Sequence, residues 1–144
     1  RFYSGKTDVI LMLNGALGGL VAITAEPLAP TPFTAIIIGA IGGVIVVVGT
    51  KLLFKLKIDD VVGAIPVHFF AGIWGTLAVP ITNADTNFGS QLLGVISVIA
   101  FVFVVSLIIW KVLAATVGIR VSKEAEEKGT DVAEIGVVAY SIRD

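Results

Sequence analysis

The chain has 144 residues, of which 56% are hydrophobic and only 15% are charged, and a soluble domain of this size has too little interior to remove so much apolar side chain from water. The absence of cysteine and the presence of a single histidine exclude a disulfide scaffold, a zinc–thiolate site and a multi-histidine metal site. With a net charge of -1, the chain has no overall basic field that would attract nucleic acid.

Four apolar stretches are close to the length of about 20 residues that a helix needs to cross a hydrocarbon layer of about 30 Å. They cover about residues 9–25, 33–50, 61–81 and 88–119. The first is marginal in length, and the last is long enough to tilt or to project from the membrane. The sequence therefore predicts an all-α, polytopic bundle of four transmembrane helices over residues 1–120, followed by a cytoplasmic tail over residues 121–144.

Basic residues are distributed unevenly between the loops. The loops at 26–32 and 82–87 contain no lysine or arginine, whereas the ten basic residues lie before the first span, in the 51–60 loop, or at and beyond the end of the fourth span. By the positive-inside rule, we expect both ends of this segment to face the cytoplasm in a multi-pass protein of the cell membrane. Glu26, at the outer end of the first span, is expected to lie in solvent, with attraction of cations as the alternative.

Small residues recur four positions apart within the predicted spans. This spacing places them on one helix face, where they let another backbone approach closely. The pairs are Gly15 and Gly19, Gly39 and Gly43, and Ala71 and Gly75. They predict tightly packed helices rather than a substrate site.

His68 is the only potentially ionised side chain in the third span, about 10 Å below its cytoplasmic end at a rise of about 1.5 Å per residue. A neutral imidazole at that depth accepts or relays a proton, or it is simply bonded to a carbonyl or hydroxyl. Pro66 removes a backbone hydrogen bond and so frees the Val62 carbonyl for a cavity or a partner group, or it merely bends the helix. Asp59 and Asp60 are expected to cap the helix N-terminus.

The sequence shows no convincing signature of an enzyme. No serine or threonine has an evident base beside it, no carboxylate pair has a cleft-like context, and no glycine-rich loop has a phosphate-binding pattern. We therefore predict no enzymatic activity, no cofactor and no bound metal.

Several linked motifs resemble, in order, the C-terminal part of the ammonium transporter (Amt/Rh) family. The stretches LNGALGGLVAITA (13–25), AIIIGAIGGVIVVVGTKLLFKLKIDD (35–60) and VGAIPVHFFAGIWGTLAV (62–79) are similar to its eighth, ninth and tenth helices. GIRV and GTDVAEIGVVAY, between 118 and 140, are similar to the exit of its last helix and its tail. The resemblance covers nearly the whole chain.

This resemblance implies a homotrimer for nitrogen uptake, in which each subunit has a narrow apolar pore lined by two hydrogen-bonded histidines that assist the passage of ammonia and a proton. His68 matches the second of these histidines, and Leu17 and Ala64 match pore-lining positions. Asp60 matches an acidic residue with a mainly structural role near the pore.

The same resemblance assigns residues of the tail. Gly129, Asp131, Gly136 and Tyr140 match a segment that packs on a neighbouring subunit and responds to a regulatory protein of the PII type. Ile135 replaces a histidine that is common in the family's tail.

Two main functions remain open at the level of sequence. Half of an inverted-repeat pathway has no counterpart in these residues, so the segment alone is not expected to conduct. The first function is ammonium or ammonia transport within a complete transporter, and the alternative is a structural membrane subunit, a short or split relative of the family. An ammonium sensor is a weaker third hypothesis, because it requires a signalling domain beyond Asp144.

Overall fold

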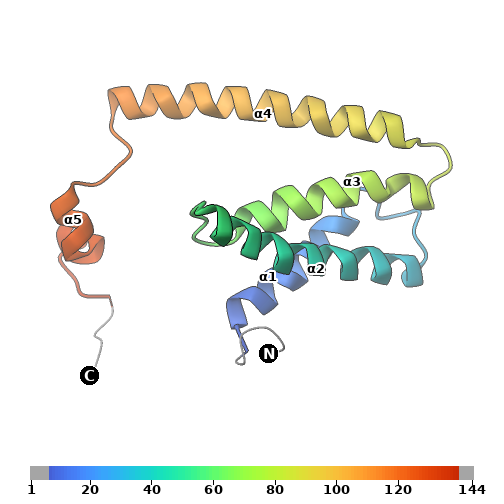
Figure 1. The fold of residues 1–144 in the computed structure, drawn as a ribbon, viewed down its shortest axis with the longest axis horizontal. Coiled ribbons are helices and arrows are strands. Elements are labelled where there is room, and N and C mark those ends of the chain that lie inside the picture. Colours follow the sequence, from blue (N-terminus) through green and yellow to red (C-terminus); the bar gives the residue numbers. More distant parts are fainter. Residues whose placement is uncertain (1–6, 140–144) are drawn as a thin grey trace. The chain divides into compact units, whose positions relative to one another are not determined.

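The computed structural model describes residues 7–139, and every regular element in that range is a helix (Figure 1). The chain divides into two compact units, Arg1–Ile99 and Ala100–Asp144. The first unit contains the helices that pack around the candidate site. The prediction of an all-α, polytopic fold is confirmed.

Within residues 7–139, three helical segments are long and apolar enough to cross a membrane: Pro32–Leu56, Ile65–Thr82 and Phe88–Thr116. The first predicted span forms a shorter apolar helix, α1 (Val9–Ile23), of 15 residues. At about 1.5 Å per residue it is shorter than the hydrocarbon layer is thick, in agreement with its predicted marginal length. Its N-terminus is capped by Asp8, whose Oδ1 accepts a hydrogen bond from the Leu11 N–H at 2.9 Å.

Helix α2 (Pro32–Leu56) extends beyond its predicted end at Thr50. The apolar periodicity continues past Lys51, and the helix stops only at Lys57, which adopts a left-handed conformation with φ 57°. At the other end, Thr31 caps the helix and proline occupies a favoured position in the first turn.

Helices α1 and α2 pack antiparallel through their glycines, as predicted from the small-residue spacing. A Cβ atom on Gly19 would lie 2.9 Å from the Gly39 carbonyl oxygen, and one on Gly43 would lie 3.1 Å from the Gly15 carbonyl oxygen. The two backbones are therefore in direct contact, which only glycine permits at these positions.

We expect Gly19→Ala to lower the thermal unfolding midpoint of the full-length protein in detergent, because overpacking a tight contact costs about 1–3 kcal/mol. Gly94→Ala is the matched control, since a Cβ atom there meets nothing within 4 Å. At Gly94 the better helix propensity of alanine raises the midpoint or leaves it unchanged. Equal shifts in the two variants would contradict the packing role of Gly19.

The third span has two parts: a π-helical segment, η1 (Ile65–Phe70), and the helix α3 (Ala71–Thr82). Two small clusters of buried apolar side chains join it to α1 and α2. One consists of Val46, Val67 and Ala71, and the other of Ala22, Ile38 and Ala78. Trp74 packs against the second cluster and donates its indole N–H to the Ile38 carbonyl oxygen at 3.0 Å.

Glu26 does not lie simply in solvent, so that expectation is wrong. Its half-buried Oε2 accepts a hydrogen bond from Asn83 Nδ2 at 2.9 Å, which ties the loop after α1 to the end of α3. The Glu26 carboxylate thus has a hydrogen-bond donor, the Asn83 amide, that carries no charge.

Helix α4 (Phe88–Thr116) has 29 residues, and none of them is buried. It ends before the predicted limit at Ile119, because Gly118 adopts a left-handed φ of 81° and donates its N–H to the Leu113 carbonyl oxygen at 3.0 Å. In the second unit, the short helix α5 (Lys123–Lys128) and a π-helical segment, η2 (Asp131–Ile135), follow.

Candidate functional site

Asp60 organises the entry to the third span. Its Oδ1 accepts a hydrogen bond from the Ala64 N–H at 2.9 Å, and its Oδ2 accepts one from the Ile65 N–H at 2.8 Å. One carboxylate thus satisfies two N–H groups at the positive end of the helix, which confirms the predicted cap. Asp59 is exposed.

The Val62 carbonyl lies in the turn before the third span and has a partner from another helix. Asn14 of α1 donates its Nδ2 hydrogen to that oxygen at 2.9 Å. The carbonyl therefore meets a partner group, but the expectation that Pro66 frees it is wrong, because the helix begins at Ile65 and Pro66 lies in its first turn, where an N–H has no acceptor within the helix. Sequence reasoning gave Asn14 no role, although an amide in an otherwise apolar helix is a signal that it has a partner.

His68 lies in the middle of η1 and is exposed, whereas Pro66 and Val67 beside it are buried. Because the third span begins at Ile65 rather than near Val61, His68 lies closer to the start of the helix than the predicted depth of about 10 Å. Within residues 7–139 no hydrogen bond holds its imidazole, so the structure gives no support to the alternative of a histidine bonded to a carbonyl or hydroxyl. A groove of about 370 Å³ in the first unit is lined by the imidazole together with mainly apolar groups, among them Gly72, Ile73 and Thr76. The exposed imidazole thus lies beside a mainly apolar groove.

The other two predicted pathway residues, Leu17 and Ala64, are also exposed. Ala64 immediately precedes η1, four residues before His68, so the backbone places both near one face of the segment. Leu17 is three residues after Asn14 and therefore shares a face of α1 with the side chain that contacts the start of the third span. The structure brings Ala64 and His68 together locally and leaves Leu17 on α1.

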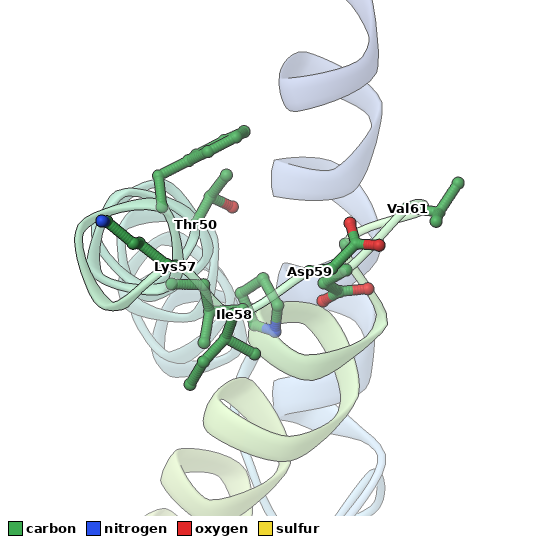
Figure 2. Close-up of a pocket in the computed structure, with 10 residues that line it drawn as sticks. Thr50, Lys57, Ile58, Asp59 and Val61 are labelled. Carbon is green, nitrogen blue, oxygen red and sulfur yellow. The ribbon is translucent and has the colours of Figure 1, made fainter. Parts of the chain in front are cut away.

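The residues on the N-terminal side of η1 also line an open pocket of about 390 Å³ (Figure 2). Its lining includes Thr50 and Lys57 from the end of α2, Asp59 and Asp60 from the loop, and Pro66 from η1. Figure 2 shows the side chains of Lys57 and Asp59 on opposite sides, with the lysine ammonium directed away from the carboxylate. The pocket therefore presents separate positive and negative groups next to the start of the third span.

The predicted tail residues form one compact turn in the second unit. Asp131 Oδ2 accepts a hydrogen bond from the Ala139 N–H at 2.8 Å. Gly129 and Gly136 have φ of 97° and 75°, and a Cβ atom on Gly129 would lie 2.6 Å from Asp131 Oδ1. These three residues are thus required by local geometry. Tyr140 lies outside the described residues.

Backbone N–H groups, first that of Ala139 and then that of Val132, lower the pKa of the Asp131 carboxyl. The pKa of Asp131 is lower in the folded turn than in the unfolded chain, so the ionised carboxylate stabilises the turn. This stabilisation is fully present at pH values above the unfolded pKa, and it is lost as the pH falls through the lower, folded pKa. We expect the Ala139 amide NMR signal of the ¹⁵N-alanine-labelled protein to titrate below the pH typical of an aspartate. In Asp131→Asn this titration should disappear, and its persistence would assign it to another group.

Long apolar helices, glycine-mediated backbone contacts and a histidine exposed within a span define a multi-pass membrane protein. Residues 1–140 match the family model described as Ammonium Transporter Family. The chain belongs to this family, so the resemblance seen in its motifs is confirmed.

Curated relatives agree with this assignment. The chain is 39% identical to the ammonium transporter Amt2 of Archaeoglobus fulgidus, over 95% of the chain and 34% of that protein. It is 36% identical to the ammonium transporter Amt1 of Haloferax mediterranei, over 96% of the chain and 28% of that protein. For Amt1 of Methanocaldococcus jannaschii the identity is 36%, over 96% of the chain and 37% of that protein. The chain thus spans about a third of the length of these relatives.

Proposed function

We propose that this chain is part of an ammonium transporter, in which His68 assists the passage of ammonia and a proton through the membrane. The observation that carries the proposal is the exposed, unbonded imidazole of His68 within the third span of a chain that belongs to this family. Two separate observations thus support ammonium transport: the exposed imidazole within a span, and the similarity of the sequence to this family.

The chemistry of the site suits a substrate that changes protonation state. A bare cation is costly in an apolar layer, whereas a neutral imidazole accepts a proton and returns it without leaving a permanent charge there. The groove beside His68 is lined mainly by apolar residues, which suits the neutral form of the substrate. Leu17 and Ala64 are proposed to line the same pathway, with Asp60 supporting its entry.

The surroundings of the pathway are also proposals. The exposed side of the imidazole is closed by further transmembrane helices outside these residues, as in transporters built from two inverted repeats. Three such subunits form a homotrimer in the cell membrane, with both ends of this segment in the cytoplasm, as the distribution of basic residues indicates. The tail around Asp131 packs on a neighbouring subunit and receives a regulatory protein of the PII type.

Uptake of radiolabelled methylammonium into proteoliposomes tests the proposal, with the purified full-length protein and protein-free vesicles as the control. We expect uptake above that of the protein-free vesicles. A correctly folded protein that gives none, and that co-purifies stably with other membrane subunits, would instead support the structural-subunit hypothesis.

A further inference from the structure

Asn14 makes a double contact with the start of the third span. Its side-chain amide donates to the Val62 carbonyl oxygen at 2.9 Å, across 48 positions of sequence. The same nitrogen lies against Gly63, where any Cβ atom would collide with it. Gly63 has φ 76°, a left-handed conformation that favours glycine. The amide of Asn14 therefore occupies the space of the missing side chain as it binds the neighbouring carbonyl.

The backbone before η1 explains why a side chain is needed at this point. The Val62 carbonyl belongs to the turn before the helix, and the left-handed Gly63 separates it from the helix that begins at Ile65, so no N–H of the first helical turn bonds to it. The Val67 N–H donates instead to the Gly63 carbonyl oxygen at 3.2 Å. A carbonyl left without a donor is costly in an apolar layer, so Asn14 supplies what the local backbone does not.

The π form of η1 connects this contact to the imidazole. An α-helix turns by about 100° per residue, and a π turn contains one residue more than an α turn. If the π turn of η1 became an α turn, the side chains before it would therefore rotate about the helix axis relative to α3. In the observed form the Ala71 N–H donates to the Pro66 carbonyl oxygen, Val67 is buried at 2% exposure, and His68 beside it is exposed. The direction of the imidazole thus depends on how η1 begins.

We propose that Asn14 is a positioning residue for His68. By holding the Val62 carbonyl and filling the space beside Gly63, it maintains the turn before η1 and the π form of η1 itself, and so it sets the direction in which the imidazole projects. The inference rests on the proposed function of His68 for its relevance to transport. It requires no contact between Asn14 and either His68 or the substrate.

The test compares Asn14→Leu with the wild-type protein. Leucine removes the amide donor to the Val62 carbonyl and keeps a side chain of similar size. The first readout is the rate at which diethyl pyrocarbonate modifies His68, measured by peptide-resolved mass spectrometry. The second is the pH profile of methylammonium uptake.

We expect Asn14→Leu to change the modification rate of His68 by about threefold or more and to shift the pH profile, because contacting groups in one network are coupled. Thr24→Val is the matched control in the same part of the chain, because the Thr24 hydroxyl bonds only to the Val21 carbonyl of its own helix, at 2.7 Å. This control should leave both readouts unchanged.

Two results would overturn the positioning role: an unchanged His68 modification rate in folded Asn14→Leu protein, or an equal change of that rate in Thr24→Val. If Asn14→Leu fails to fold, Asn14→Ala replaces it, since alanine has no hydrogen to donate and adds no bulk beside Gly63. A wild-type protein without uptake would contradict the proposed function alone, because the modification rate still reports the position of the imidazole.

Discussion

Replacement of His68 by alanine is expected to reduce methylammonium uptake by the full-length protein at least about tenfold, since a positioned proton-transfer group commonly contributes a factor of about 100 or more. The imidazole is exposed and makes no hydrogen bond within residues 7–139, so its removal should affect the pathway more than the fold. The measurement is the initial rate of uptake into proteoliposomes, normalised to the amount of inserted protein.

Ile81→Ala is a suitable control, because this side chain is 66% exposed at the opposite end of the third span. It should retain wild-type uptake. The thermal unfolding midpoints of both variants show whether either substitution damages the fold. An unchanged rate in stable, correctly inserted His68→Ala protein would exclude His68 from the transport step and would leave its exposure within the span without a function.

The helices of this protein and much of their packing could be predicted from sequence, because these features depend on local composition. Runs of apolar residues give the spans, and glycines four apart give the contact of α1 with α2, where Gly19 meets Gly39.

The partners of these groups could not be predicted, because they depend on the register between distant helices. Asn14 binds a carbonyl 48 positions away, and Glu26 binds Asn83 across 57 positions. Composition places Glu26 in a loop but does not show which amide lies opposite. The π form of η1 likewise has no simple sequence pattern.

The cap of the third span should matter for both stability and transport. Asp60→Ala removes the acceptor of two backbone hydrogen bonds, those from Ala64 at 2.9 Å and Ile65 at 2.8 Å. Loss of a helix cap costs about 0.5–2 kcal/mol, and these bonds involve a charged acceptor, so we expect a cost near the top of that range. The thermal unfolding midpoint in detergent and the uptake rate should both fall.

Asp59→Ala provides a control of the same charge change at the adjacent position, where the side chain is exposed. If the negative charge near the pocket were the important property, the two variants would behave alike. If the cap is important, only Asp60→Ala loses stability, and Asp60→Asn recovers part of it because its amide oxygen still accepts one N–H. In that case Asp60 affects transport through the conformation of η1, because its two hydrogen bonds lie at the start of the segment that carries His68.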